Sequence, residues 1–367
     1  MKSVGFLFLT TMAHAMHMLT IAREFALIGK GEAVIYVSNK EMENSIKSFF
    51  KDYTQAKYKI KFLKPPLIHR ILRYFKQRHH PRARYVIKSN IKELFINDAL
   101  VMTDERILEY KNHDHPLFIG VGHGAGDRAC AFNELYRGFD YFFLSGLAKQ
   151  NRMLSEELVS PETSRLIGYP KFDITFNTPT ETHFNNDRPV VLYNPHFNKN
   201  ETSWFKWGEM ILNFFIENTQ YNLLFAPHIL LFGKKKKLNK KFYNHKNIII
   251  DLESNKLCDM TYIKSADIYL GDVSSQVYEF IGFKPRPCIF LNANRASWQG
   301  NQDFRMWKMG DVVENMASFA DHLQSAFDRH EVYQSQQQLL RSETFSITSE
   351  SAGKRGATAI IDIIDGL

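Results

Sequence analysis

Short apolar runs alternate with mixed or polar stretches along almost the whole chain. The runs that we interpret as buried strands are 3–10, 33–39, 99–104, 116–123, 139–146 and 164–170, followed by 190–196, 222–228, 247–252, 266–272 and 286–292. Segment 17–31, which two glycines end, is interpreted as a helix between the first two strands. Because strands that are apolar on both faces must be covered by helices on both sides, the pattern predicts an α/β fold with parallel sheets.

The polar, turn-rich segment 176–189 has no periodicity and is the best candidate for a linker. It divides the chain into an N-terminal domain, 1–178, and a C-terminal domain, 188–367. We expect two Rossmann-like domains whose parallel sheets face a central cleft. The apolar tail 356–367 predicts a final helix, for which packing back on the N-terminal domain is allowed.

Composition narrows the class of protein. Of the 367 residues, 44% are aliphatic or aromatic, enough for two cores. The three cysteines form no CxxC pair, which argues against a zinc knuckle or a disulfide framework and fits a reducing cytoplasm. The apolar run Val4–Leu9 is too short for a signal peptide, and no run approaches the length of a membrane-spanning helix. We therefore expect a cytoplasmic protein.

The net charge of +8 favours an anionic partner. Segment 68–92 mixes arginines with apolar residues at helical spacing, the pattern of a helix that lies on a membrane surface or grips a polyanion, so peripheral contact with a membrane is one expectation for it. The lysine run 233–242 is interpreted as a solvated loop. Only Tyr74, Phe75 and Tyr85 could stack on bases within the basic stretch, so no nucleic acid is expected as a partner.

Open parallel sheets bind ligands at the carboxyl ends of their strands. The polar residues at these ends are His14, His17, His123, Gly124, Asn194, His196, His228, Asp272, Ser274 and Ser275. Histidines and hydroxyls predominate among them. "HDH" at 113–115 has no second ligand cluster to support a metal site, and "GVGHGAGD" has Asp127 where a dinucleotide fingerprint needs its third glycine.

The stretch "GDVSSQVYEF", 271–280, places two serines between a strand and a helix. Serine hydroxyls and the free N–H groups of a helix start can hold a phosphate. Glu279, one turn further on, could accept hydrogen bonds from a ribose. The simpler alternative is that a serine only caps the helix and that Glu279 lies on the surface.

Five motifs occur in one order: "GHGAGDR" (122–128), "GYPKFD" (168–173), "VLYNPHF" (191–197), "LLFAPH" (223–228) and "ADIYLGDVSSQVYEF" (266–280). This set resembles the CDP-glycerol glycerophosphotransferase family, which includes teichoic-acid primases and polymerases. The resemblance implies a GT-B fold with the nucleotide held by the second domain. It implies a transferase that moves glycerol phosphate, or a similar alditol phosphate, from a CDP-activated donor to a hydroxyl of a cell-envelope glycan or lipid-linked acceptor.

The resemblance also implies roles for residues. His228, Ser274 and Ser275 would hold the donor diphosphate, Asp272 would shape that turn, Glu279 would meet the ribose, and Asn194 and His196 would lie with the donor. His123 would act as the base or contact a phosphate, with His14, His17, Gly124 and Arg128 on the acceptor side. No cofactor is implied, because the nucleotide diphosphate is a substrate, and no metal is strictly required if side chains and the helix dipole neutralise the leaving group.

Three motifs depart from the family pattern. "PHP" is "PHI" here, with Ala226 where a basic residue is common; "YAPTWR" is "YNPHFN", with His196 in place of threonine; and "HGTPLK" is "HGAGDR", where Arg128 stands in for lysine. These departures affect donor and acceptor contacts. They leave open an alternative, a GT-B glycosyltransferase that uses a UDP-, GDP- or CMP-sugar to build a surface polysaccharide such as a capsule. An epimerase acting on nucleotide sugars is disfavoured, because the expected cleft lacks a set of carboxylates.

Overall fold

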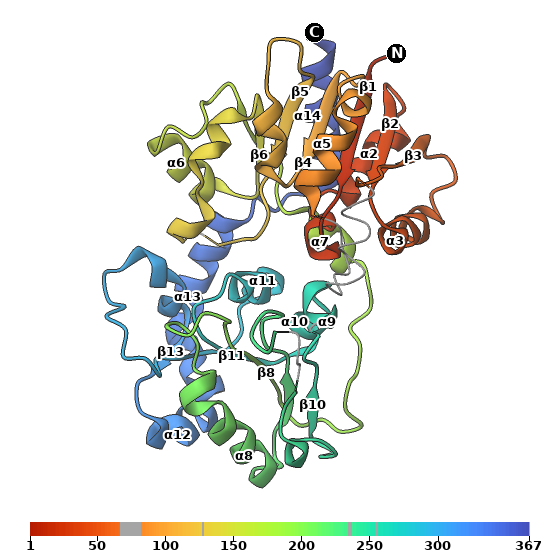
Figure 1. Ribbon diagram of the computed structural model, residues 1–367. Helices are drawn as coiled ribbons and strands as arrows, with labels where there is room; N and C mark the ends of the chain where they lie inside the picture. Colours follow the sequence, from red (N-terminus) through yellow and green to blue (C-terminus); the bar gives the residue numbers. More distant parts are fainter. Residues whose placement is uncertain (67–81, 127, 234–236, 254, 367) are drawn as a thin grey trace. The chain divides into compact units, whose positions relative to one another are not determined.

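The computed structural model describes residues 1–66, 82–126, 128–233, 237–253 and 255–366 (Figure 1). The chain folds into two compact units, each built from more than one segment. Unit 1 comprises Met1–His123, Phe132–Phe176 and Phe345–Leu367, and unit 2 comprises Gly124–Ala131 and Asn177–Thr344. The short segment Gly124–Ala131 therefore belongs to unit 2, although the sequence-based division assigned it to the N-terminal domain.

Unit 1 contains a seven-stranded sheet in which every strand pair is parallel. Its order is β3 (Tyr58–Phe62), β2 (Glu32–Val37), β1 (Ser3–Phe8), β4 (Ala99–Met102), β5 (Leu117–Val121), β6 (Tyr141–Leu144) and β7 (Ser164–Leu166). The predicted parallel α/β fold is confirmed. Sequence reasoning missed β3, an edge strand whose lysines interrupt the apolar run.

Alternate residues of these strands enter two separate cores, as the two-residue period of a strand requires. Phe6 and Phe8 of β1 face a core shared with α2 (Leu19–Ile28), α3 (Lys40–Phe50) and α14 (Ala352–Asp365). Leu7 and Leu9 enter the opposite core, which includes residues of α5 (Ala83–Leu94), α6 (Leu147–Ser155) and the short helix η1 (Glu105–Tyr110). The sheet is thus covered on both faces (Figure 1).

The final helix, α14, is fastened to unit 1 by Asp173 of α7 (Pro170–Thr175). The Asp173 carboxylate accepts hydrogen bonds from the backbone N–H groups of Ala352 (3.0 Å) and Gly353 (2.6 Å), at the start of α14. A carboxylate at this position also complements the helix dipole. Gly353 permits close packing on α2, because a Cβ there would lie 2.7 Å from the Cβ of Thr20. The last residue of "GYPKFD" therefore acts as a helix anchor.

Unit 2 repeats the architecture with six parallel strands. Their order is β10 (Ile248–Ile250), β9 (Asn222–Phe225), β8 (Val190–Asn194), β11 (Ile268–Gly271), β12 (Cys288–Leu291) and β13 (Asp311–Val313). Residues of α8 (Glu209–Glu217) and α12 (Phe319–Gln324) share one core with the sheet. The remaining α-helices are α9 (Asn255–Cys258), α10 (Thr261–Ser265), α11 (Gln276–Phe283) and α13 (Ala326–Thr344).

Part of the predicted membrane-contact segment, 68–92, falls on residues 67–81, which lie outside the described residues. The rest forms the start of α5, whose Ala83, Val86 and Ile87 are buried in the core of unit 1. Residues 234–236 of the lysine run are likewise outside the description. None of the helices described here combines the length and apolar character needed to cross a bilayer.

Candidate functional site

The donor-side candidates gather at the switch point of the unit 2 sheet. Strands β8 and β11 are neighbours there, and Asn194 is paired with Gly271 at their carboxyl ends. The chain continues to β9 on one side and β12 on the other, so the connections diverge at this point. Open α/β sheets bind ligands where such a divergence occurs. Asn194, His196, His228 and the stretch Asp272–Ser275 all follow strands at this edge.

The side chain of Asn194 forms hydrogen bonds across the strand ends through both of its polar atoms. Its Nδ2 donates to the carbonyl oxygen of Ala226 (2.7 Å), and its Oδ1 accepts from the hydroxyl of Tyr269 (3.2 Å). These contacts join β8, β9 and β11. The side chain therefore helps to fix the shape of the edge, and its contact with a donor stays a prediction.

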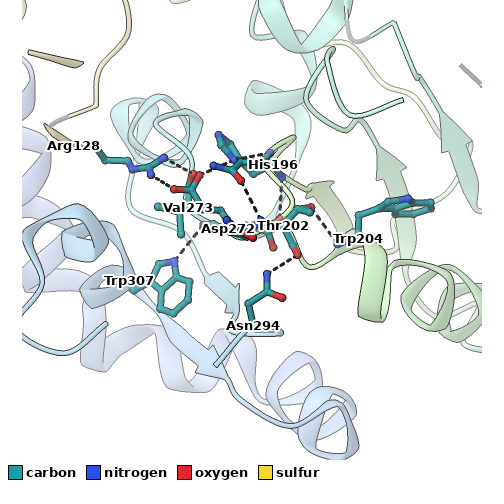
Figure 2. Close-up of polar contacts among 11 residues, drawn as sticks. Arg128, His196, Thr202, Trp204, Asp272, Val273, Asn294 and Trp307 are labelled. Atoms are coloured by element: carbon teal, nitrogen blue, oxygen red, sulfur yellow. Dashed lines mark hydrogen bonds and ion pairs between the residues drawn. The ribbon is translucent and has the colours of Figure 1, made fainter. Parts of the chain in front are cut away.

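Asp272 is fully buried and organises the loop after β8 (Figure 2). Its Oδ2 accepts a hydrogen bond from the backbone N–H of His196 (2.9 Å), and Trp307 Nε1 donates to its carbonyl oxygen (3.3 Å). Burial raises the pKa of this carboxyl to about 7, and nearby Ser203, His196 and Thr202 counteract part of the rise. Its Oδ1 has no hydrogen-bond partner among the described residues.

Arg128 lies with the donor candidates, which differs from its predicted place on the acceptor side. Its Nη1 donates to the carbonyl oxygen of Val273 (3.3 Å), and its Nη2 pairs with Oε1 of Glu201 (Figure 2). The next residue, Ala129, donates its backbone N–H to Asp303 Oδ1 (2.7 Å). Segment 124–131 is thus held in unit 2 by two adjacent residues.

Glu201, which sequence reasoning missed, connects Arg128 to His196. Its second oxygen, Oε2, lies 3.0 Å from His196 Nδ1, while its first is paired with Arg128. The backbone N–H of Asn198 also points at Nδ1, from 3.3 Å. An ionised carboxylate is the stronger partner, which favours a proton on Nδ1 and leaves Nε2 as an acceptor. Glu201 lies in a loop without periodicity, so no local signal marks it.

His196 and His228 are uncharged near neutral pH. Burial, with His228 and Arg128 nearby, lowers the pKa of His196 to about 4, and burial also lowers the pKa of His228. The two ring centroids are 5.8 Å apart. His228 Nδ1 accepts a hydrogen bond from the backbone N–H of Leu230 (3.2 Å), so its Nε2 carries the proton. A neutral ring with Nε2–H can donate to a phosphate oxygen.

The two serines differ in their surroundings. Ser274 is buried, and its hydroxyl accepts from the backbone N–H of Gln276 (3.3 Å), in the manner of a helix cap. The hydroxyl of Ser275 makes no cap bond and no hydrogen bond to any described residue, although the backbone carbonyl of Ser275 accepts from the N–H of Tyr278 (3.1 Å). Segment 124–131 approaches it closely: a Cβ on Gly126 would lie 2.9 Å from Ser275 Cβ, and one on Gly124 would lie 4.0 Å from Ser275 Oγ. The helix-cap alternative therefore fits Ser274 alone.

Glu279 is buried within α11, so the alternative that placed it on the surface is wrong. Its contact with a ribose stays a prediction. Among the described residues, no group of three or more His, Cys, Asp or Glu side chains could hold a metal ion.

The acceptor-side histidines lie in unit 1. His14 of α1 (Met12–Ala15) meets His123 edge to face, with ring centroids 4.5 Å apart. His17 is buried, and its ring is 5.2 Å from that of Tyr169. Burial, with His14 and Lys149 nearby, lowers the pKa of His123 to about 3. The structure brings these three histidines together and adds two buried lysines, Lys149 and Lys171, that sequence reasoning missed.

Solved structures with the same fold include enzymes of wall-polymer and nucleotide-sugar chemistry. The wall teichoic acid polymerase TagF, soaked with CDPG, is 14% identical with a TM-score of 0.66, over 100% of this chain and 89% of that chain. MnaA from S. aureus with UDP is 16% identical (TM-score 0.63; 100% and 96%). The UDP-GlcNAc 2-epimerase from Neisseria meningitidis bound to UDP-GlcNAc is 13% identical (TM-score 0.62; 100% and 100%). At these identities the likeness concerns the fold, and it confirms the predicted GT-B class.

A comparison with curated protein sequences found no match. A family model described as CDP-glycerol:poly(glycerophosphate) glycerophosphotransferase matches residues 122–362, which is well over half of the chain. The match begins at the "GHGAGDR" motif and runs through every donor-side residue described above. The chain therefore belongs to the CDP-glycerol:poly(glycerophosphate) glycerophosphotransferase family.

Proposed function

We propose that this protein transfers a glycerol phosphate, or a similar alditol phosphate, from a CDP-activated donor to a hydroxyl group of a cell-envelope glycan or lipid-linked acceptor. The acceptor oxygen attacks the β-phosphorus and forms a new P–O bond. The bond between that phosphorus and the bridging oxygen breaks, and CMP leaves with the bridging oxygen. The proton of the attacking hydroxyl passes to a base, for which His123 is the candidate.

The groups of unit 2 suit the donor. His228 can donate from Nε2, Ser275 has a hydroxyl that the fold does not use, and Ser274 lies at the start of α11. Such donors stabilise the charge that grows on the leaving phosphate. Glu201 and Arg128 hold His196 and the loop in place and so act as positioning residues.

The observation that carries the proposal is the packing of Gly124 and Gly126 against Ser275. Gly124 follows His123, the candidate base, directly in the chain. Gly124 has a φ of 76°, a conformation that side chains disfavour. This arrangement gives a role to the otherwise unused hydroxyl of Ser275, which a simple helix cap does not.

The test is nucleotide binding, measured by thermal shift and calorimetry with CDP, CDP-glycerol, CMP, UDP, GDP and UDP-sugars. Wild type is compared with Ser275→Ala and with Ser342→Ala, a control on the exposed side of α13. We expect CDP and CDP-glycerol to bind wild type and the control, and binding to weaken in Ser275→Ala. A preference for UDP or GDP that depends on Ser275 would favour the glycosyltransferase alternative. No response to any nucleotide would overturn the donor site.

A lipid-linked acceptor would bring the enzyme to the inner face of the membrane, with 68–92 as the predicted contact. Vesicle sedimentation at several fractions of anionic lipid tests this part separately. We expect binding to increase with anionic lipid and to fall with salt. Binding that does not depend on anionic lipid would remove the membrane contact and leave the transfer reaction untouched.

A further inference from the structure

We propose that the outer side of the crossover between β9 and β10 binds the surface of an anionic lipid bilayer. The crossover comprises residues 226–247, of which 234–236 lie outside the described residues. It belongs to unit 2 and is separate from 68–92, the membrane contact considered above, which belongs to unit 1. The surface itself does not depend on the proposed reaction, and only the advantage of lying close to lipid rests on that function.

The crossover concentrates positive charge. From His228 to Ile250 the sequence contains seven lysines and neither an aspartate nor a glutamate, which nearly equals the net charge of +8 carried by the whole chain. Lys237, Lys240 and Lys241 are exposed, and none of the three forms an ion pair with a described residue. An exposed basic surface without acids complements anionic headgroups, because each lysine held near a negatively charged bilayer adds to the attraction.

The crossover also has an inner side, which packs on the core of unit 2. Phe242 is fully buried there, and Phe232 and Leu238 pack against the same core. The Phe232 ring meets the ring of Trp204 with centroids 5.0 Å apart. These apolar contacts are spread along the crossover, so they hold one side of it against the unit and fix which of its residues face outward.

Large apolar groups accompany the lysines on the outer side. Ile229 is 44% exposed, Leu230 is 60% exposed and Tyr243 is 38% exposed. An aliphatic pair that faces water gains free energy when it enters the apolar part of a bilayer, and tyrosine is common at the level of the headgroups. A soluble polyanion would attract the lysines equally well but would offer no apolar surroundings to Ile229 and Leu230. The combination therefore favours a lipid surface.

The turn that presents the aliphatic pair is built on the donor-side histidine. The N–H of Leu231 donates to the carbonyl oxygen of His228 (2.8 Å), and the N–H of Leu230 donates to His228 Nδ1 (3.2 Å). The N–H of Gly233 in turn donates to the carbonyl oxygen of Leu230 (3.3 Å). Ile229 and Leu230 are thus held one and two residues after a candidate donor ligand. A bilayer bound here would lie next to the donor site, which suits an acceptor carried on a lipid.

The experiment locates the contact by hydrogen–deuterium exchange and measures vesicle affinity by sedimentation, both without nucleotide. The vesicles contain phosphatidylglycerol mixed with phosphatidylcholine, or phosphatidylcholine alone. We expect only the anionic vesicles to protect the amides of the crossover, and the protection to decrease as salt is added. Affinity should fall by more than about tenfold in the double variant Lys240→Glu, Lys241→Glu, and by about tenfold in Ile229→Ser, Leu230→Ser.

Two matched double variants serve as controls within unit 2. Lys284→Glu, Lys308→Glu makes the same change of charge at exposed positions outside the crossover. Val332→Ser, Leu339→Ser removes two exposed apolar side chains from α13. Both controls should bind anionic vesicles within about threefold of wild type, because screening limits the effect of a distant charge. Losses as large as those of the crossover variants would show that the crossover has no special role.

Three further results would overturn the inference. Protection confined to 82–95 would assign the contact to the other predicted segment. Equal binding of vesicles that lack phosphatidylglycerol would remove the role of the lysines. Protection of the crossover by dextran sulfate but not by vesicles would identify a soluble polyanion as the ligand. CDP affinity is measured separately on the same proteins, so that absence of CDP binding defeats the proposed function and leaves the lipid contact standing.

Discussion

The two sheets of this protein end in edges that are built on different physical principles. At the unit 2 edge, polar side chains are fixed by directed hydrogen bonds: Asn194 to Ala226 and Tyr269, Asp272 to His196, and Glu201 to Arg128. At the unit 1 edge, His14 and His123 meet edge to face, His17 packs against Tyr169, and two buried lysines lie nearby. The same strand order therefore supports a network of carboxylate and amide hydrogen bonds in one unit and a cluster of histidines and lysines in the other.

The difference fits the two substrates of the proposed reaction. A nucleotide diphosphate has a fixed set of acceptor atoms, and donors held in advance lose little entropy when it binds. A cluster of histidine rings can instead supply a base for the hydroxyl of an acceptor. Each prediction below tests one side of this contrast.

The largest expected effect concerns unit 1. His123→Gln should lower the rate of CMP release from CDP-glycerol, with a lipid-linked glycan acceptor, by about 10²–10⁴-fold, the usual contribution of a general base. CDP affinity should stay within about twofold of wild type, because donor binding belongs to unit 2. Stopped-flow or discontinuous assays measure the rate of CMP release, and calorimetry measures the affinity for CDP. A parallel loss of CDP affinity would mean that His123 acts on the donor, and the contrast between the edges would fail.

The second effect is on stability and belongs to Asp272 in unit 2. Its pKa rises from 3.8 to about 7 on folding, so between these values the folded protein holds more protons than the unfolded chain. Stability should therefore fall as the pH rises from about 4 to about 7, by at most about 4 kcal/mol. Asp272→Asn keeps the shape and removes this dependence.

Comparing Asp272→Asn with wild type isolates the contribution of Asp272 to the pH dependence of stability. The comparison is needed because the buried histidines change the stability with pH in the opposite direction. The pKa values of His123 and His196 are lowered, so they reduce stability as the pH falls below about 6.5. They contribute equally to both proteins. Urea unfolding at a series of pH values measures the difference, and a constant gap between the two proteins across that range would show that the carboxyl of Asp272 does not titrate there.

Much of the fold and of its strand ends could be predicted from the sequence. The strands that the prediction missed were missed for identifiable physical reasons. The strands and the residues that end them follow from apolar runs and from the rule that parallel strands share an edge. Strand β3 was missed because lysines break its apolar pattern, and β13 because it has only three residues, one of them Asp311. Both are edge strands, where burial does not demand a continuous apolar run.

The hydrogen-bond and ion-pair partners of individual side chains could not be predicted from local sequence patterns. The two hydrogen bonds of the Asn194 side chain join it to residues 32 and 75 positions away. Glu201, Lys149 and Lys171 lie in a loop and on helices where a charged residue has no special meaning in the sequence. Arg128, predicted on the acceptor side, lies in unit 2 because segment 124–131 leaves the unit in which the preceding strand lies. Each of these contacts depends on long-range packing.

The third effect tests the directed bonds of unit 2. Arg128→Leu removes both contacts of the guanidinium and leaves Glu201 without its ion-pair partner, so unfolding of unit 2 should become easier by about 1–3 kcal/mol. Arg84→Leu is the matched control, because Arg84 forms an exposed pair with Glu109 whose loss should cost at most about 0.5 kcal/mol. Chemical unfolding monitored by tryptophan fluorescence compares them. Equal costs would mean that the Arg128–Glu201 pair behaves as an ordinary surface pair.

The smallest effects distinguish the two serines and decide what "DVSS" is for. Ser274→Ala removes a hydroxyl that caps α11 and should lower the unfolding free energy by about 0.5–1 kcal/mol. Ser275→Ala removes a hydroxyl without a partner in the fold and should change it by less than about 0.5 kcal/mol. Because the fold does not use the Ser275 hydroxyl, its loss should instead appear in CDP affinity. Differential scanning calorimetry with and without CDP separates the two cases. If Ser275→Ala destabilises the free protein as much as Ser274→Ala and binds CDP as well as wild type does, both serines serve the helix and the donor phosphate must bind elsewhere.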